Sequence, residues 1–281
     1  MPRILTADEA GACYGVERAL AMAEEAVSNA EGPVHTLGPL IHNPRVVADL
    51  ESAGITVVRT PAEAAGETLL LRTHGVTPEV EREAREVCRH VLDATCPFVK
   101  KVHVAAERLS REGYQVVVVG EAGHPEVEAT VAHAAGAVVV DSAAEARSLG
   151  LHGKVGVVVQ TTQSHARLME VVGELLACAD EVRVFDTICE ATSGHQRACD
   201  ELARTVDVMV VIGGRNSANT TRLAEIAAKS CPSTHHVECA DELDPAWFVG
   251  ARAIGITAGA STPASQIAAA RSTITRMVGE E

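Results

Sequence analysis

Residues 93–128 read DATCPFVKKVHVAAERLSREGYQVVVVGEAGHPEVE, and this stretch predicts the fold of the chain. After Cys96, apolar residues recur at helical spacing up to Gly113, a residue typical of a helix end. Those apolar residues are Val99, Val102, Ala106 and Leu109. Pro97 is compatible only with the first turn, so the helix should begin at Cys96. The run QVVVV then predicts a buried strand that ends in the polar motif GEAGHPEVE.

The same pattern occurs three times along the chain. Cys13 in GACYGVERALAMAEEA and Cys189 in DTICEATSGHQRACDELA also open amphipathic helical stretches. The apolar runs VHTL (34–37) and VMVVI (208–212) follow them and lead into GPLIHNPRVV and GGRNSANTTRLAE. The spacing is 29 positions from Cys13 to His42, 28 from Cys96 to His124 and 28 from Cys189 to Ser217. This regularity indicates an internal repeat of about ninety residues.

Each repeat continues with two more apolar runs, the last of which ends in RTHGVTP (72–78), QTTQSHA (160–166) or TAGASTP (257–263). Near-continuous valine runs are typical of parallel strands covered on both faces. We therefore expect three pseudo-threefold-related α/β lobes at 1–89, 90–180 and 181–281, each with a small, mostly parallel four-stranded sheet. Since ligands bind at the carboxyl ends of such strands, we expect a trefoil whose functional edges face one centre.

Composition excludes several classes of protein. A net charge of −14 and only 2% aromatic residues disfavour nucleic-acid binding. No apolar run approaches the roughly 18 residues of a membrane span, and the start MPRILTADEA lacks the features of a signal peptide. We therefore expect a cytoplasmic protein whose eight cysteines do not form disulfides.

Cys13, Cys96 and Cys189 occupy equivalent positions of the three repeats, and no C-x-x-C motif is present. Three thiolates suit a 4Fe–4S cluster with one iron left free for substrate, and such a cluster can degrade to a 3Fe–4S form. Zinc with a water as fourth ligand is the alternative. The other cysteines show no such equivalence and should be buried apolar residues. They are Cys88, Cys178, Cys199, Cys231 and Cys239.

A second set of polar side chains lies at the predicted strand ends, where imidazoles, hydroxyls and an amide suit a phosphate or diphosphate. The set is His42, His74, His124, Thr161, Ser217, Asn219 and Ser261. Helix capping is the alternative role for the serines and Asn219. Glu126 follows His124 by two residues and could relay protons, or it could favour a helix start through the dipole.

At these residues the sequence resembles the LytB (IspH) family, the 4-hydroxy-3-methylbut-2-enyl diphosphate reductases. The resemblance covers essentially the whole chain, through CYGVERA, IHNPRVV, THGVTP, DATCPFVKKVH, GHPEVE, QTT, RNSANTTRLAE and TAGAS. It implies an oxidoreductase of isoprenoid biosynthesis that removes the allylic hydroxyl of its substrate to give isopentenyl and dimethylallyl diphosphates. It further implies a trefoil around an oxygen-sensitive 4Fe–4S cluster, with ferredoxin or flavodoxin as the electron donor.

By the same resemblance, Cys13, Cys96 and Cys189 are the cluster ligands, and Glu126 is the catalytic proton donor, with His124 and Thr161 near the substrate hydroxyl. His42, His74, Ser217, Asn219 and Ser261 then form the substrate pocket together with His124 and Thr161.

Several residues depart from the family pattern, since Ala12 and Ala218 stand where Phe and Ser are common, and Arg72 replaces a small residue. These departures keep two alternatives open. One is a paralogue acting on a different allylic or phosphorylated alcohol, and the other is a non-catalytic iron–sulfur or redox-sensing protein.

Overall fold

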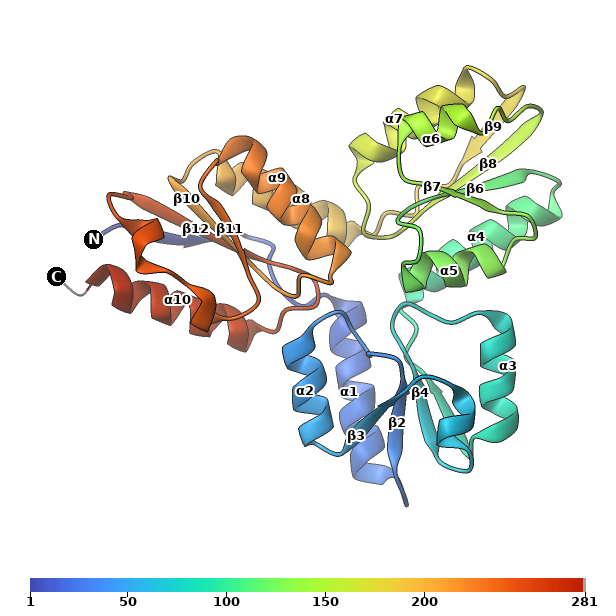
Figure 1. Cartoon of the computed structure of the whole chain (residues 1–281), viewed down its shortest axis with the longest axis horizontal. Helices are drawn as coiled ribbons and strands as arrows, with labels where there is room; N and C mark the ends of the chain where they lie inside the picture. The colour runs from blue at the N-terminus through green and yellow to red at the C-terminus, as the bar shows by residue number, and fades with distance from the viewer. Residues whose placement is uncertain (280–281) are drawn as a thin grey trace. The chain divides into compact units, whose positions relative to one another are not determined.

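The computed structural model describes residues 1–279, and these form three four-stranded sheets (Figure 1). The strand orders are β3-β2-β4-β5, β7-β6-β8-β9 and, read in the same sense, β11-β10-β12-β1. Every pair of neighbouring strands is parallel. One topology therefore recurs in all three sheets, which confirms the predicted α/β class and the internal repeat.

The strands are short and follow the apolar runs of the sequence. The first sheet contains β2 (Val34–Leu37), β3 (Ile55–Val58), β4 (Thr68–Leu71) and β5 (His90–Asp93). The second contains β6 (Gln115–Val119), β7 (Val138–Val140), β8 (Lys154–Val159) and β9 (Glu181–Val184). The third contains β1 (Arg3–Thr6), β10 (Val208–Ile212), β11 (Thr234–Val237) and β12 (Ala253–Ala258).

Helices connect these strands, as parallel pairing requires. They are α1 (Tyr14–Asn29), α2 (Pro44–Ser52), α3 (Pro78–Val87), α4 (Pro97–Arg111), α5 (Pro125–Ala132), α6 (Ala143–Ser148), α7 (His165–Leu176), α8 (Glu190–Ala203), α9 (Ala218–Ser230) and α10 (Ala264–Gly279). Short 3₁₀ turns lie at η1 (Pro61–Ala64), η2 (Ala240–Glu242) and η3 (Pro245–Phe248). Helix α4 begins at Pro97 with Cys96 as its N-cap residue, as the position of the proline predicts.

The lobe boundaries expected from the sequence need correction. Strands β5 and β9 lie just past the expected boundaries at 89/90 and 180/181, yet β5 pairs with β4 and β9 with β8, in the preceding sheet. Strand β1 pairs with β12 at the other end of the chain rather than within 1–89. The strand before each cysteine is thus an edge strand of the sheet that it ends. The cysteine follows this edge strand, and the helix after the cysteine leads the chain to the next sheet.

By its internal contacts the chain divides into two compact units rather than three. The terminal unit comprises residues 1–16, 42–46 and the described residues from 190 onward, and it holds the third sheet. The central unit comprises residues 17–41 and 47–189 and holds the first two sheets.

The cores are built from small aliphatic residues. In the second sheet the valines of β6 and β8 are almost completely buried, and α4 covers one face through Leu109, which is fully buried. Gly156 in β8 allows this helix to lie close, because a Cβ at that position would lie 2.7 Å from Leu109 Cδ2. Close packing of this kind compensates for the scarcity of aromatic residues.

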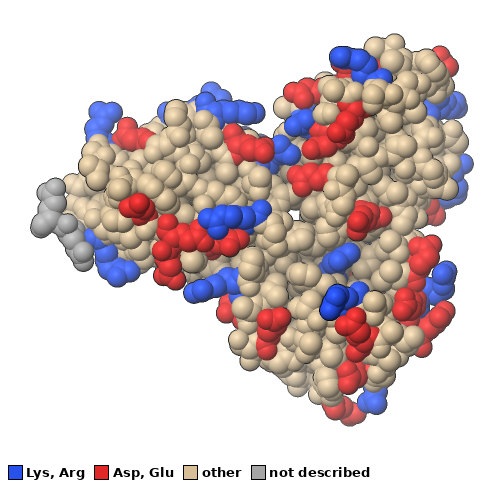
Figure 2. All heavy atoms as spheres, viewed as in Figure 1, with Lys and Arg blue, Asp and Glu red and all other residues tan. Residues whose placement is uncertain are grey.

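Charged side chains of both signs are interspersed on the face of the molecule shown in Figure 2. Several form helical pairs four residues apart, such as Arg85–Glu81, Arg108–Glu112 and Arg204–Asp200. Exposed pairs of this type contribute little to stability, so the fold rests on apolar packing. Among the described helices, none combines the length and the apolar character that a membrane span requires.

Helix α4 offers a test of the packing. Leu109→Ala should lower the free energy of unfolding by about 2–5 kcal/mol, because it removes buried contacts and leaves a cavity. Val104→Ala on the same helix, where the side chain is 62% exposed, should change it by less than about 0.5 kcal/mol. Urea unfolding followed by circular dichroism measures both, and equal losses would contradict the assigned burial.

Candidate active site

The sequence-predicted polar residues lie where the chain changes direction within each sheet. In the second sheet β6 leads outward to β7 and the chain then returns to β8 on the other side, so a crevice is expected at the carboxyl ends of β6 and β8. His124 and Glu126 follow β6, and Thr161 follows β8. His74 follows β4 in the equivalent position of the first sheet, and Ser217 and Ser261 follow β10 and β12 of the third.

Glu126 and Thr161 form a buried polar contact in the central unit. Glu126 lies in the first turn of α5 and is 2% exposed. One carboxylate oxygen, Oε1, accepts a hydrogen bond from the Thr161 backbone N–H at 2.6 Å, and the other, Oε2, accepts one from Thr161 Oγ1 at 2.8 Å. Thr161 therefore fixes the orientation of the carboxyl group at the end of β8.

Burial dominates the acidity of this carboxyl group. It raises the pKa of Glu126 to about 7, against the lowering effect of the two hydrogen bonds from Thr161. A carboxyl group with this pKa carries a proton in a large fraction of molecules at neutral pH. Glu126 is thus suited to donate a proton, which an ordinary glutamate at that pH is not.

Two histidines of the central unit lie together beside this pair. His124 is the N-cap residue of α5, and its Nδ1 accepts a hydrogen bond from the Glu126 backbone N–H at 3.1 Å. The ring of His74 contacts that of His124 edge to face, with centroids 5.5 Å apart. The first and second sheets thus place His74, His124, Glu126 and Thr161 in one group.

Each of the three repeat cysteines is anchored by an equivalent backbone hydrogen bond. Cys96 N–H donates to Thr73 O at 3.0 Å, and Cys189 N–H donates to Thr161 O at 3.1 Å, both within the central unit. In the terminal unit, Cys13 N–H donates to Ala260 O at 3.1 Å. Each acceptor lies two residues after the end of its strand, β4, β8 or β12. The cysteines are half-buried, and no disulfide forms among residues 1–279.

The other five cysteines are only partly as predicted. Cys199 and Cys231 are buried, and burial raises the pKa of the Cys199 thiol to about 12, so it stays protonated. Cys88, Cys178 and Cys239 are half-buried, contrary to the prediction, because they lie at or near the ends of elements rather than within the core.

The polar groups of the terminal unit surround the start of α9. Ser217 is the N-cap residue, and its Oγ accepts a hydrogen bond from Thr220 N–H at 3.3 Å, so the expected capping role is present. Asn219 is 3% exposed, yet neither atom of its side-chain amide has a hydrogen-bond partner among the described residues. Unpaired buried amides are costly, so Asn219 is a candidate ligand-binding group at a helix start that favours anions.

The backbone of His42 lies against the same part of the terminal unit. Ser261 Oγ donates to His42 O at 3.1 Å, and the side-chain amide of Asn43 donates to Ser261 O at 2.9 Å. Gly214 permits this approach, since a Cβ there would lie 2.9 Å from His42 O. Asn43 itself is 2% exposed and was not among the predicted site residues. Its position next to His42 in the IHNP motif is the sequence feature that could have identified it as a site residue.

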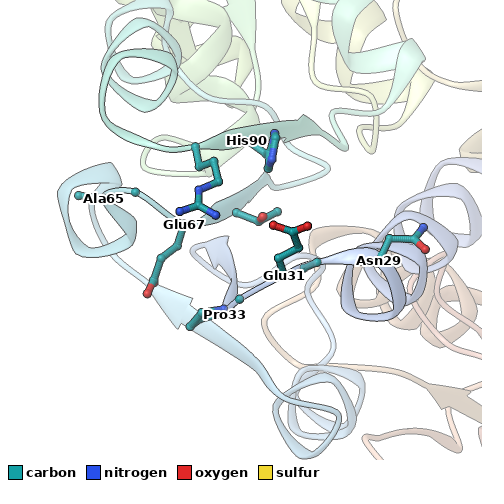
Figure 3. A pocket seen from close by; sticks show the side chains of 11 residues that line it. Asn29, Glu31, Pro33, Ala65, Glu67 and His90 are labelled. Carbon is teal, nitrogen blue, oxygen red and sulfur yellow. The ribbon is translucent and has the colours of Figure 1, made fainter.

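The cavity in Figure 3 lies elsewhere in the central unit. It has a volume of about 570 Å³ and is lined by residues that precede or begin strands, among them Pro33 before β2, Glu67 before β4 and His90 at the start of β5. It therefore opens at the amino ends of the first sheet, the edge opposite to His74 and Cys96. Its walls carry both acidic and basic groups, and it holds none of the predicted site residues.

Comparison with known families matches residues 4–275 of this chain to the LytB protein family. The chain belongs to the LytB family. Among curated LytB relatives, proteins of Geobacter metallireducens and Aquifex aeolicus are named 4-hydroxy-3-methylbut-2-enyl diphosphate reductase. The former is 51% identical over 92% of both chains, and the latter is 45% identical over 94% of this chain and 92% of its own.

Solved structures give the same result for the fold. A structure titled as (E)-4-hydroxy-3-methyl-but-2-enyl diphosphate reductase, the terminal enzyme of the non-mevalonate pathway, is 44% identical with a TM-score of 0.73, and the match covers 98% of this chain and all of the other. The Plasmodium falciparum E-1-hydroxy-2-methyl-but-2-enyl-4-diphosphate reductase has a TM-score of 0.91 over 98% of this chain and 88% of its own. At 24% identity the latter supports the LytB fold alone.

The buried carboxyl group makes stability depend on pH. A group whose pKa is raised from 4.5 to about 7 by folding contributes stability that is complete below about pH 4.5 and is lost as the pH rises through about 7. Glu126→Gln cannot ionise, so the stability of the wild type relative to this variant should fall by roughly 3 kcal/mol between about pH 4.5 and pH 8. Urea unfolding across that range measures the difference.

Glu128→Gln is the matched control, because it removes an exposed carboxylate from the same helix. It should leave the pH dependence of the wild type unchanged. Parallel stability curves for the wild type and Glu126→Gln would contradict the burial of an ionisable Glu126.

Proposed function

We propose that this protein reduces 4-hydroxy-3-methylbut-2-enyl diphosphate to isopentenyl and dimethylallyl diphosphates. In this reaction the allylic C–O bond breaks, a C–H bond forms, and two electrons and two protons are consumed as water leaves. The names and identities of the LytB relatives support the reaction. The observation that carries it is the buried Glu126, which is hydrogen-bonded to Thr161, whose carbonyl in turn accepts from Cys189 N–H.

We infer a 4Fe–4S cluster held by Cys13, Cys96 and Cys189. Their donor set suits this group, because three half-buried thiols at equivalent repeat positions each have a backbone amide already bonded and a side chain outside any described disulfide. When bound, the cluster would pass electrons from the donor to the substrate and supply a Lewis-acidic iron for the hydroxyl oxygen. Of the five remaining cysteines, Cys88, Cys178 and Cys231 donate their N–H groups to helix carbonyls, at Ala84, Leu175 and Ala227, rather than to a carbonyl past a strand end.

The protein's own residues would then bind the substrate and move protons. Ser217, Asn219 and Ser261 would offer hydroxyl and amide groups to the diphosphate near the start of α9. His42 and His74 are the further substrate-binding residues of this proposal. His124 and Thr161 would orient the allylic hydroxyl, while Glu126 delivers the proton for water loss. The hydrogen bonds that Thr161 donates to Glu126, from its backbone N–H and its hydroxyl, support this pairing of roles.

An external donor must supply the electrons, and we infer a ferredoxin or flavodoxin in the cytoplasm. Thiol ligands and the absence of disulfides among residues 1–279 suit a reducing compartment.

Anaerobic purification with iron and sulfide analysis tests the proposal directly. Roughly four irons per chain, and turnover of the hydroxy-methylbutenyl diphosphate with dithionite-reduced viologen, are the expected results. A full cluster without turnover of this substrate would redirect the proposal to another allylic alcohol. Zinc or no metal in the anaerobic preparation would overturn it.

Cys96→Ser should lose iron and activity together, because it removes one of three thiolates from the cluster. Cys178→Ser is the matched control, since Cys178 is also half-buried but lies beyond the end of α7. Iron content and viologen-linked turnover measure both. A Cys96→Ser variant that keeps its iron would contradict the ligand assignment.

Glu126→Gln should retain the cluster but lose about 10²-fold or more in kcat, because the glutamine amide can accept from Thr161 N–H and donate to Thr161 Oγ1 but has no transferable proton. In the wild type, kcat/KM should fall as the pH rises through about 7, where Glu126 loses its proton. Steady-state rates at several pH values check both results, and a near-normal Glu126→Gln rate would place the proton donor elsewhere.

A further inference from the structure

The turn that carries His74 is held within the central unit by contacts on several sides. Thr73 donates to Leu40 O through both its N–H, at 3.1 Å, and its hydroxyl, at 2.9 Å. Arg72 Nε donates to Gly75 O at 3.3 Å, and Gly75 N–H donates back to Arg72 O at 3.0 Å. Gly75 has a φ of +76°, a conformation that other residues adopt only with strain. The turn therefore has one defined shape.

His103 packs directly against this turn from α4. Its side chain comes so close to Gly75 that a Cβ there would lie 2.8 Å from His103 Cε1 and 3.4 Å from Nε2. The same Cβ would lie 3.3 Å from Thr95 Cγ2. Glycine at position 75 is thus required by the imidazole as well as by the backbone angle. The His103 ring also stacks on His133, with centroids 4.3 Å apart and planes inclined by 20°.

The imidazole of His103 acts here as an uncharged ring. It is 8% exposed, and its Nε2 has no hydrogen-bond partner among residues 1–279. Burial, aided by His133 and Lys100 and opposed by Asp93, lowers the pKa of His103 to about 4. The ring is therefore neutral at physiological pH, and it contacts Gly75 by packing rather than through a charge.

Helix α4 carries both His103 and, at its N-terminal end, Cys96. Cys96 is the N-cap residue of α4, and its N–H bonds Thr73 O in the same turn that His103 supports at Gly75. The two ends of the turn are thus both held by α4, one through a backbone hydrogen bond and the other through the imidazole. A rigid helix carrying both contacts fixes the position of His74 relative to Cys96.

We propose that His103 is a positioning residue for His74, holding the Thr73–Gly75 turn so that the His74 ring faces the reaction site. This inference rests on the proposed function, in which His74 contacts the substrate. It assigns His103 no contact with the substrate and no proton transfer. Loss of the ring should let the turn move and weaken substrate binding, and any neutral ring of similar size should restore it.

His103→Ala should raise KM by about tenfold or more while kcat stays within about threefold and the iron content is unchanged. His103→Phe should return KM to within about threefold of the wild type, because it supplies a flat neutral ring. His133→Ala is the matched control, since it removes the imidazole that stacks on His103 and should leave KM close to the wild-type value.

A second measurement, the NMR resonances of the His74 ring, does not depend on turnover. In holoprotein labelled with ¹⁵N-histidine, the ring resonances assigned by a His74→Asn variant should shift or broaden in His103→Ala and return in His103→Phe. Unchanged His74 resonances in His103→Ala would overturn the inference, even where the wild type reduces the hydroxy-methylbutenyl diphosphate. Shifted resonances in a protein without that turnover would support the positioning role and refute the proposed function instead. Equal effects of His103→Ala and His103→Phe on the resonances would also overturn it.

Discussion

One backbone hydrogen bond, repeated three times, organises the features on which the proposed chemistry depends. In each repeat the N–H of the cysteine donates to the carbonyl group two residues past the end of a central strand, at Thr73, Thr161 or Ala260. The acceptor strand lies beside the edge strand from which the chain reaches the cysteine. The bond therefore ties a cysteine, the proposed cluster ligand, to the loop that carries a histidine, a threonine or a serine of the proposed substrate pocket. The sheet itself therefore holds each of these cysteines close to one of the polar residues at the strand ends.

The position of Glu126 shows how this arrangement tunes acidity. The sheet places the carboxyl group at the carboxyl ends of two central strands, where burial favours its protonated form. Thr161 offsets part of this effect with two hydrogen bonds, so the pKa stays near 7 and the group can both hold and release a proton near neutral pH. Because the Thr161 backbone carbonyl also accepts from the Cys189 N–H, the segment that orients Glu126, the proposed proton donor, also anchors Cys189.

Most elements could be predicted from the sequence, because their signals are local. Helix α4 begins at Pro97, as the proline indicates, and β6 covers the QVVVV run, as its continuous apolar character predicts. The expected lobe boundaries separated β1, β5 and β9 from the sheets in which they pair, since the apolar pattern of a strand does not identify its neighbour. Asn43 and His103 were not singled out for a related reason. Their partners, Ser261 and Gly75, are distant in the sequence, so only the folded chain brings them into contact.

The sequence by itself determined the threefold repeat, the α/β class and which residue types lie at the strand ends, because periodicity and spacing are properties of neighbouring residues. Only the tertiary structure decided which strands pair, that Glu126 is buried against Thr161, and that the Asn219 amide has no hydrogen-bond partner among residues 1–279. Burial and hydrogen bonding between distant segments set these features, since both depend on the environment that the whole unit creates around a side chain. The candidate functional residues could therefore be identified from the sequence, but their protonation states and orientations could not.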